Sequence, residues 1–205
     1  MSKADETRAN IILRAASLFN QQGYAGATMS DIMKVTGLKK GGIYNHFSSK
    51  DELAIAAFDF AFQQVAQRYL EVLKEHQGAI DRLNAMVYTF TTAIEDAPIA
   101  GGCPLMNTAI DSDDAHPALR ERAQQAMGRW RSLIHRIVDR GRQRGEVRDE
   151  VQADAVATIL ISTLEGALMM TKLCGDRVHL QRAQVHLDKY IDSLRDDSLT
   201  DAESQ

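Results

Sequence analysis

The stretch GLKKGGIYNHFSSKDEL, residues 37–53, places two adjacent glycines, Gly41 and Gly42, where a helix is expected to begin. A glycine inside a helix costs about 1 kcal/mol relative to alanine, because its backbone loses more freedom on folding. The pair therefore indicates that something approaches the bare backbone closely. A neighbouring helix or a bound partner would both satisfy this requirement, and these residues alone leave both explanations open.

The residues before this stretch predict two helices. Apolar residues recur with helical spacing over residues 5–22, and Gly23 is placed to end that first helix. Thr28 and Asp31 have the spacing of a capping box, in which each side chain binds the other residue's backbone N–H, so a second helix begins there. Gly37 supplies the turn that ends it.

Two more helices follow from the same kind of signal. Ile32 and Val35 are expected to point inward from the second helix, and a third short helix is expected over residues 39–45. Ser49 and Glu52 form a second capping-box pattern, which begins a long helix. Its predicted apolar face consists of Phe58, Phe62, Val65, Tyr69 and Val72.

The remaining sequence also predicts helices, over residues 78–95, 103–110, 117–144, 153–173 and 178–195. Residues 153–173 are apolar on more than one face, so one face is expected to be free for a partner. Residues 178–195 carry a single apolar stripe that we also expect to be available to a partner: Ala183, Leu187, Tyr190, Ile191 and Leu194. Both helices would suit a helix bundle between two subunits.

Composition supports an all-α protein. The chain has 205 residues, of which 44% are hydrophobic and 25% charged, with only three prolines. We expect a three-helix domain at 1–50, a second helical domain at 51–195, and a polar tail at 196–205. Two cysteines and no secretory signal favour a reducing cytoplasm. The apolar run over residues 155–164 is too short to cross a membrane.

Charge is distributed unevenly along the chain. Residues 1–50 contain seven basic and three acidic side chains, a net charge of +4, whereas residues 51–205 carry −8, which gives −4 overall. This asymmetry predicts a basic surface confined to the N-terminal segment rather than general attraction to nucleic acid.

A short helix, a glycine turn and a second short helix in a basic segment are typical of a helix-turn-helix, whose second helix enters the DNA major groove. Glycines at the start of that helix would let the backbone approach the duplex, where free N–H groups and the helix dipole favour phosphate. The side chains that could contribute charge or hydrogen bonds are Lys39, Lys40, Lys50, Tyr44, Asn45 and His46.

Residues 23–53 resemble the DNA-binding domain of the TetR family of bacterial transcriptional regulators, of the TetR/AcrR type. The matching positions are Gly23-Tyr24, Thr28, Asp31-Ile32, Gly37-Leu38, Lys40-Gly41, Ile43-Tyr44, His46-Phe47, Ser49-Lys50 and Leu53. Met33 departs from the usual alanine. Lys39 departs from the usual small capping residue, which makes the third helix more basic and its cap weaker.

The resemblance implies a homodimer that binds operator DNA, with a C-terminal region for dimerisation and a small-molecule effector. It places Thr28, Lys40, Tyr44, His46 and Lys50 near phosphates, and Lys39, Gly41, Gly42 and Asn45 near base edges. Tyr44 and Phe47 could instead be core residues, and Phe47 is expected to be one. The function predicted in this way is transcriptional repression, released by the effector and requiring no cofactor.

The effector is expected to be a mainly apolar molecule with one polar or cationic group oriented by Glu165 or Asn107. Met side chains adapt to irregular apolar shapes, and Glu165 interrupts an apolar helix where a carboxylate needs a partner. The candidate pocket residues are Tyr88, Cys103, Met106, Asn107, Met127, Trp130, Ile134, Glu165 and Met169.

Cys103 also supports an alternative, a thiol-based redox or electrophile sensor, because Pro104 would place this thiol at a helix N-cap. A further rival is an enzyme that uses Cys103 with a histidine, although no local motif pairs the two. The acidic cluster of Asp111, Asp113, Asp114 and His116 has oxygen ligands that suit a hard cation, but a solvated loop is the more ordinary explanation. We therefore expect no metal site.

Overall fold

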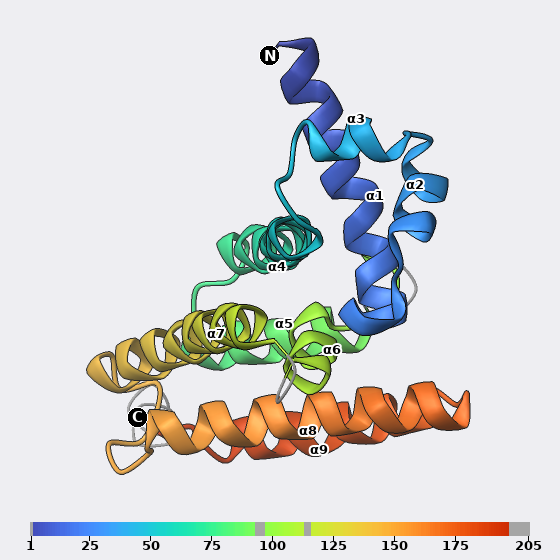
Figure 1. Ribbon diagram of the computed structural model, residues 1–205. Helices are drawn as coiled ribbons and strands as arrows, with labels where there is room; N and C mark the ends of the chain where they lie inside the picture. Colours follow the sequence, from blue (N-terminus) through green and yellow to red (C-terminus); the bar gives the residue numbers. More distant parts are fainter. Residues whose placement is uncertain (1, 93–96, 113–115, 197–205) are drawn as a thin grey trace, which may run out of the picture. The chain divides into compact units, whose positions relative to one another are not determined.

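A computed structural model of the chain describes residues 2–92, 97–112 and 116–196 (Figure 1). Within those ranges the regular elements are α-helices, apart from one isolated antiparallel bridge between Val147 and Arg195. The all-α prediction is confirmed. The helices are α1 Lys3–Gly26, α2 Met29–Thr36, α3 Lys40–Tyr44, α4 Lys50–Lys74, α5 Ala79–Thr92, α6 Pro104–Asp111, α7 Pro117–Gln143, α8 Ala153–Cys174 and α9 Val178–Asp192.

The chain packs into two compact units, each built from two separate stretches of sequence. The first contains residues 1–67 and 97–127, and the second contains residues 68–96 and 128–205. The linear division at residues 50 and 195 remains a prediction about function. The compact units do not follow it, because α6 packs with α1 in the first unit.

The helix-turn-helix of the first unit forms from local signals. The capping box of α2 is present, since Asp31 N donates to Thr28 Oγ1 at 3.2 Å and Thr28 N donates to Asp31 Oδ2 at 3.0 Å. Gly37 ends α2 in the left-handed region, with φ of 71°, and α3 follows (Figure 1). The core beneath these helices includes Ile11, Ala15, Ile32, Ile43, Phe47 and Leu53.

Two details of this unit differ from the sequence-based expectation. Val35 was expected to point inward, but 37% of its surface is exposed, because the eight-residue helix α2 buries only Ile32 fully. Gly23 does break α1, with φ of 75° and ψ of 167°, yet helical residues continue on its far side as far as Gly26. Gly23 therefore kinks the helix instead of ending it.

The second capping box is shifted by one residue. Glu52 N donates to Ser49 Oγ at 3.0 Å, as expected, but the Glu52 carboxylate accepts from the backbone N and the hydroxyl of Ser48, both at 2.7 Å. These hydrogen bonds to Ser48 hold the pKa of Glu52 below its usual value. The turn between α3 and α4 is thus tied to the first turn of α4.

In the second unit, α5, α8 and α9 pack together, and α8 and α9 run side by side (Figure 1). The prediction that the apolar stripe of α9 faces a partner is wrong for most of the stripe. Leu187 and Ile191 are fully buried within the protomer, because α9 lies between α5 and α8. The large apolar side chains left exposed on these two helices are Met169, Met170, Leu173 and Val185.

Helix α8 is long and apolar enough to pass a length-and-composition test for a membrane span, with a mean hydropathy of 1.4. The sequence-based expectation considered only the apolar run over residues 155–164 and therefore underestimated the length of the apolar helix. However, residues such as Leu160, Leu164 and Leu168 are buried against the rest of the unit. Core packing accounts for that part of its apolar character, and the polar tail beyond residue 196 lies outside the described residues.

Candidate DNA-binding site and effector residues

The glycines of α3 face open space. A Cβ atom built on Gly41 would meet no neighbouring atom within 4 Å, and one on Gly42 would make only ordinary contacts with Leu38, the nearest at 3.7 Å. Close helix packing therefore does not require either glycine. Of the two explanations for the pair, the approach of an external partner is the one that this geometry favours.

The outer face of α3 is polar and exposed, whereas its inner face is core. Lys39, Lys40 and Asn45 are exposed, and Tyr44 retains 40% of its surface, with Lys40 Nζ lying 5.7 Å from the centre of its ring. Ile43 is buried, as is Phe47 just beyond the helix. Tyr44 is thus a surface residue, and Phe47 is the core residue of the two.

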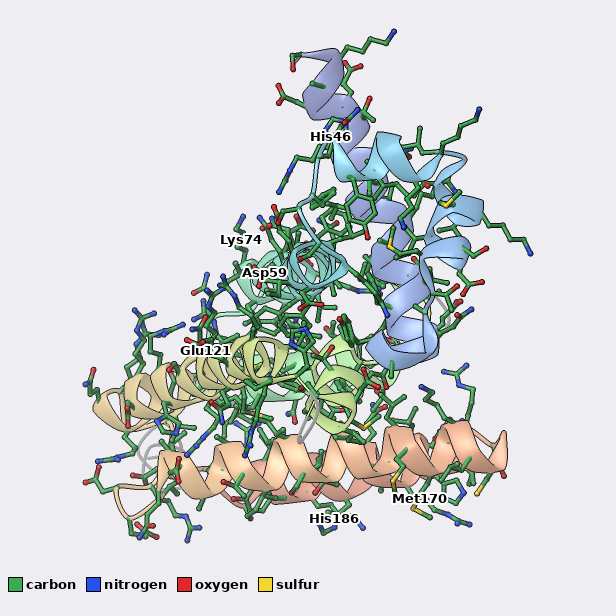
Figure 2. The ribbon with its side chains drawn as sticks, in the orientation of Figure 1. His46, Asp59, Lys74, Glu121, Met170 and His186 are labelled. Atoms are coloured by element: carbon green, nitrogen blue, oxygen red, sulfur yellow. The ribbon has the colours of Figure 1, made fainter. Side chains whose placement is uncertain are left out.

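The N-cap of α3 is weak, as its sequence implies. Lys39 occupies the cap position and makes no side-chain hydrogen bond to the helix. Thr28 is exposed at the start of α2, but its hydroxyl and backbone are engaged by Asp31. Those hydrogen bonds from Thr28 lower the pKa of Asp31. His46 is half-buried where the chain leaves α3 (Figure 2).

Lys50 is engaged inside the first unit. Its Nζ donates to the Tyr24 carbonyl at 2.6 Å and lies 4.2 Å from the centre of the Tyr24 ring. The Tyr24 hydroxyl in turn donates to Asp51, and burial together with this hydrogen bond raises the pKa of Tyr24 to about 12. This geometry favours a role for Lys50 in joining the start of α4 to the end of α1.

Arg8 is a candidate that the motif-based reasoning missed. Its guanidinium lies 4.8 Å from the centre of the Phe47 ring, although Arg8 itself is exposed. The only sequence signal for it is its contribution to the positive charge of residues 1–50, because a contact between residues 39 positions apart has no local pattern. Arg8 adds a cation beside the turn that follows α3.

The candidate effector residues are divided between the two units. Cys103, Met106, Asn107 and Met127 belong to the first unit. The second unit contains Tyr88, Trp130, Ile134, Glu165 and Met169. Within their own units Ile134 is buried, Met106, Met127 and Glu165 are half-buried, and Tyr88 and Met169 are largely exposed, at 60% and 47%.

In the first unit, Asn107 holds α6 against α1. Its Nδ2 lies 2.9 Å from Asn20 Oδ1, 3.0 Å from the Asn20 carbonyl and 2.9 Å from the Gly101 carbonyl. The same residue lines a small cleft of about 30 Å³ between α1, α4 and α6. Cys103 is the N-cap of α6, with Pro104 as the first helical residue, as its sequence predicts.

In the second unit, Trp130 is the centre of an aromatic group. Its ring stacks on Phe90, with centroids 6.0 Å apart, and lies at a tilt against Tyr69 at 6.3 Å. The indole Nε1 is buried and has no hydrogen-bond partner among the described residues. A buried N–H without an acceptor is unfavourable, so this position is suited to an acceptor supplied by a ligand.

The described residues contain no group of three or more potential metal ligands. Of the acidic cluster considered as a cation site, Asp113 and Asp114 lie outside the described residues. Asp111 has a structural role, because its Oδ2 accepts the backbone N–H of Tyr24 at 2.6 Å. His116 is buried, and its Nδ1 accepts the backbone N–H of Leu119 at 3.2 Å.

Comparisons with known proteins agree over most of the chain. Residues 11–57 match the family described as "Bacterial regulatory proteins, tetR family", and residues 79–187 match "Tetracyclin repressor-like, C-terminal domain". A TetR transcriptional regulator from Chloroflexus aurantiacus J-10-FL is 45% identical. Its crystal structure superposes with a TM-score of 0.91 over 95% of this chain and 98% of that one.

Two more distant proteins are also similar. The transcriptional repressor DhaR of Mycobacterium sp. strain GP1 is 21% identical over 85% of this chain and 87% of its own. A cysteine mutant of the regulator CifR, solved with 26-bp double-strand operator DNA, shares the fold with a TM-score of 0.76 at 20% identity, over 86% and 94% of the two chains. The chain therefore belongs to the TetR family of bacterial transcriptional regulators, which bind DNA and are not enzymes.

Proposed function

We propose that this protein is a cytoplasmic transcriptional repressor that binds a palindromic operator as a homodimer and is released by a small-molecule effector. The observation that carries the proposal is the bare outer face of α3, where Gly41 has no neighbour within 4 Å of a Cβ position. The similarity to the repressor DhaR and to the operator complex of CifR supports repression and operator binding by this chain.

In this proposal α3 lies in the major groove. Lys39, Gly41, Gly42 and Asn45 approach base edges, and Lys40, Tyr44, Thr28 and His46 contact phosphates. Arg8 joins the phosphate contacts, because it is exposed beside the turn after α3. Lys50 acts indirectly by fixing the start of α4 through its hydrogen bond to Tyr24.

Dimerisation uses the exposed face of α8 with α9. Met170 and Leu173 are apolar and exposed on α8, Leu173 at 79%, and Val185 is exposed on α9. Gly166 lies one turn before Met170, and a Cβ there would meet nothing within 4 Å, so a partner helix could approach closely. Figure 2 labels Met170 and His186, which project from these two helices.

The effector site centres on Trp130. The Phe90 and Tyr69 rings supply an apolar surface, and the unsatisfied Nε1 supplies a donor for one polar atom of the ligand. Trp130 thereby joins Glu165 as a residue expected to make the polar contact with the ligand, and Asn107 becomes a weaker candidate. The amide of Asn107 already lies within hydrogen-bonding distance of Asn20 and Gly101.

The test is selection of the bound sequence from a random duplex library with the purified full-length chain. The proposal expects an inverted repeat bound by two protomers, with half-sites about one helical turn, ~34–36 Å, apart or at a spacing adjusted by DNA distortion. In reporter cells, deletion of the gene should raise expression from a promoter that carries the selected site. A direct repeat bound by one protomer, or lowered expression, would contradict it.

A second candidate is control through the Cys103 thiol. This candidate rests on the position of Cys103 as the N-cap of α6, because helix N-termini are among the environments in which reactive cysteines occur. Replacing Cys103 with serine separates the two forms of control. A ligand-controlled repressor keeps its response to the effector, whereas a thiol sensor loses its response to oxidants and electrophiles.

A further inference from the structure

The second unit contains a polar cleft of about 330 Å³ at the junction of α4, α5 and the end of α7. None of the candidate effector residues lines it. Four of its lining side chains are cations, Lys74, Arg82, Arg140 and Arg144, and one, Glu146, is an acid. With His76 neutral, the lining carries a net charge of +3, although the whole chain carries −4.

The single acid of this cleft is already engaged. Glu146 Oε2 accepts the backbone N–H of Ala79 at 2.5 Å, at the start of α5, and Glu146 Oε1 lies 3.7 Å from Arg144. Arg82 donates through Nε to the His76 carbonyl at 2.7 Å, which holds its position without neutralising its charge. Among the described residues, neither Lys74 nor Arg140 forms an ion pair.

Close packing keeps these cations together. A Cβ on Gly141 would lie 2.5 Å from Ala79 Cβ and 2.7 Å from Val147 Cγ2, so α7 packs with its bare backbone against the start of α5. This contact brings Arg140 and Arg144 into the same cleft as Arg82. The two arginines are four residues apart on consecutive turns, where like charges repel.

We propose that this cleft binds a small polyanion carrying two or more phosphate or carboxylate charges. Arginine forks match the geometry of both groups, and a concave site lined by one sign of charge concentrates the field on a bound anion. The volume lies within the range of small-molecule sites. This inference goes beyond the proposed function and concerns a site separate from the aromatic group around Trp130.

Isothermal titration of the full-length chain with pyrophosphate and with citrate, each at constant ionic strength, tests the proposal. The expected result is saturable binding of at least one probe, with one site per protomer. Lys74→Gln and Arg140→Gln should each weaken that binding by about tenfold. Both side chains are exposed, so the thermal unfolding midpoint should stay close to that of the wild type. Tighter binding of pyrophosphate assigns phosphate chemistry to the cleft, and tighter binding of citrate assigns carboxylate chemistry.

Two matched variants distinguish this cleft from other cationic surfaces. Arg129→Gln removes the same charge from an exposed position of α7 about 16 Å along the helix from Arg140. Lys34→Gln removes the same charge from an exposed position of α2. Both should bind the probes within twofold of the wild type. The proposal is overturned if neither probe gives saturable binding, or if a control variant weakens binding as much as Lys74→Gln and Arg140→Gln do.

Discussion

Two glycines of the helix-turn-helix have opposite physical roles. Gly37 has a φ of 71°, a conformation that disfavours any residue with a Cβ by about 1–2 kcal/mol. Gly41 has ordinary helical geometry and open space around it, so nothing inside the protein requires a glycine there. Gly37 is therefore a folding residue, and Gly41 is a candidate contact residue.

Gly41→Ala should leave the protein as stable as the wild type or up to about 1 kcal/mol more stable, because alanine is the better helix former. It should weaken operator binding about tenfold or more, since the added methyl group holds the backbone away from DNA. Gly37→Ala should instead lower the unfolding free energy by about 1–2 kcal/mol. Thermal unfolding and operator titration measure both effects. Unchanged operator affinity in Gly41→Ala would remove the reason for assigning α3 to the groove.

Substitutions at Lys40 and Lys50 should likewise affect different properties, DNA affinity for Lys40 and protein stability for Lys50. Lys40→Ala should weaken binding to all sequences and reduce the slope of log affinity against log salt by about 1, because one phosphate contact is lost. Lys50→Ala should mainly lower the unfolding midpoint, because it removes the hydrogen bond to Tyr24 and the contact with its ring. A salt slope that falls with Lys50→Ala and stays constant with Lys40→Ala would reverse the assignment.

The stability of each helix in this protein depends on the hydrogen bonds at its ends and on which of its faces is covered by other helices. Helix α2 has eight residues, too few to be stable alone, and its capping box supplies hydrogen bonds that such a short helix cannot make internally. Helix α8, in contrast, is long and apolar, so burial of its apolar side chains contributes most to its stability. Its large apolar side chains that remain exposed lie near its C-terminal end.

The α2 capping box predicts a pH dependence of stability. The folded pKa of Asp31 is lowered from 3.8 by its hydrogen bonds to Thr28, so the ionised form is favoured in the folded state. The resulting stabilisation is fully present above the unfolded pKa and is lost as pH falls through the lower folded pKa. Denaturant unfolding should show wild type exceeding Asp31→Asn in stability at pH 6, with the difference shrinking below about pH 4. Asp149→Asn, at an exposed position, is the control, and an equal pH trend in it would refute the assignment to Asp31.

The exposed face of α8 predicts the oligomeric state. Met170→Glu and Leu173→Glu should give folded monomers in sedimentation, with much weaker operator binding, because burying a carboxylate in the interface is unfavourable. Gln124→Glu, on α7, should remain dimeric. Leu187→Glu should unfold the protomer instead, since Leu187 is fully buried inside it. Dimers that survive charges at both Met170 and Leu173 would place the interface elsewhere.

At the scale of the whole molecule, control requires that a ligand distinguish two states of the regulator. A ligand with equal affinity for the DNA-bound and free states would shift nothing. Trp130 lies in the second unit and α3 in the first, so the linkage between ligand and operator is a property of the complete chain. Linkage is reciprocal, which makes it measurable from either side.

A compound that releases the protein from its operator should bind 5–150-fold more weakly when operator is present, which corresponds to a coupling of about 1–3 kcal/mol. Calorimetry with and without the selected operator measures this factor directly. Trp130→Phe keeps the aromatic surface but removes the N–H, so it should lower the affinity for the ligand and leave the affinity for the operator unchanged. Equal ligand affinity in both titrations would eliminate ligand-driven release and move control to Cys103.

The sequence by itself determined the features that depend on neighbouring residues. The Thr28 and Asp31 pair, Gly37 and Pro104 define helix ends within a few positions, because caps and turns are made by residues one to four apart. The helix-turn-helix and its family followed from the same local pattern. The sequence also identified Phe47 as the core residue and left Tyr44 open, because an aromatic side chain beside a short helix can pack on either side.

The tertiary structure decided what covers each surface. Periodicity marked the stripe through Leu187 as apolar, but only the packing of α9 against α5 and α8 buried it inside the protomer and left Leu173 exposed. Likewise Lys74, Arg82 and Arg140 are unremarkable charges in the sequence and line one cleft in the folded chain. Helical period specifies the direction of a side chain about its own axis. The neighbour in that direction is set by contacts between residues far apart in the chain.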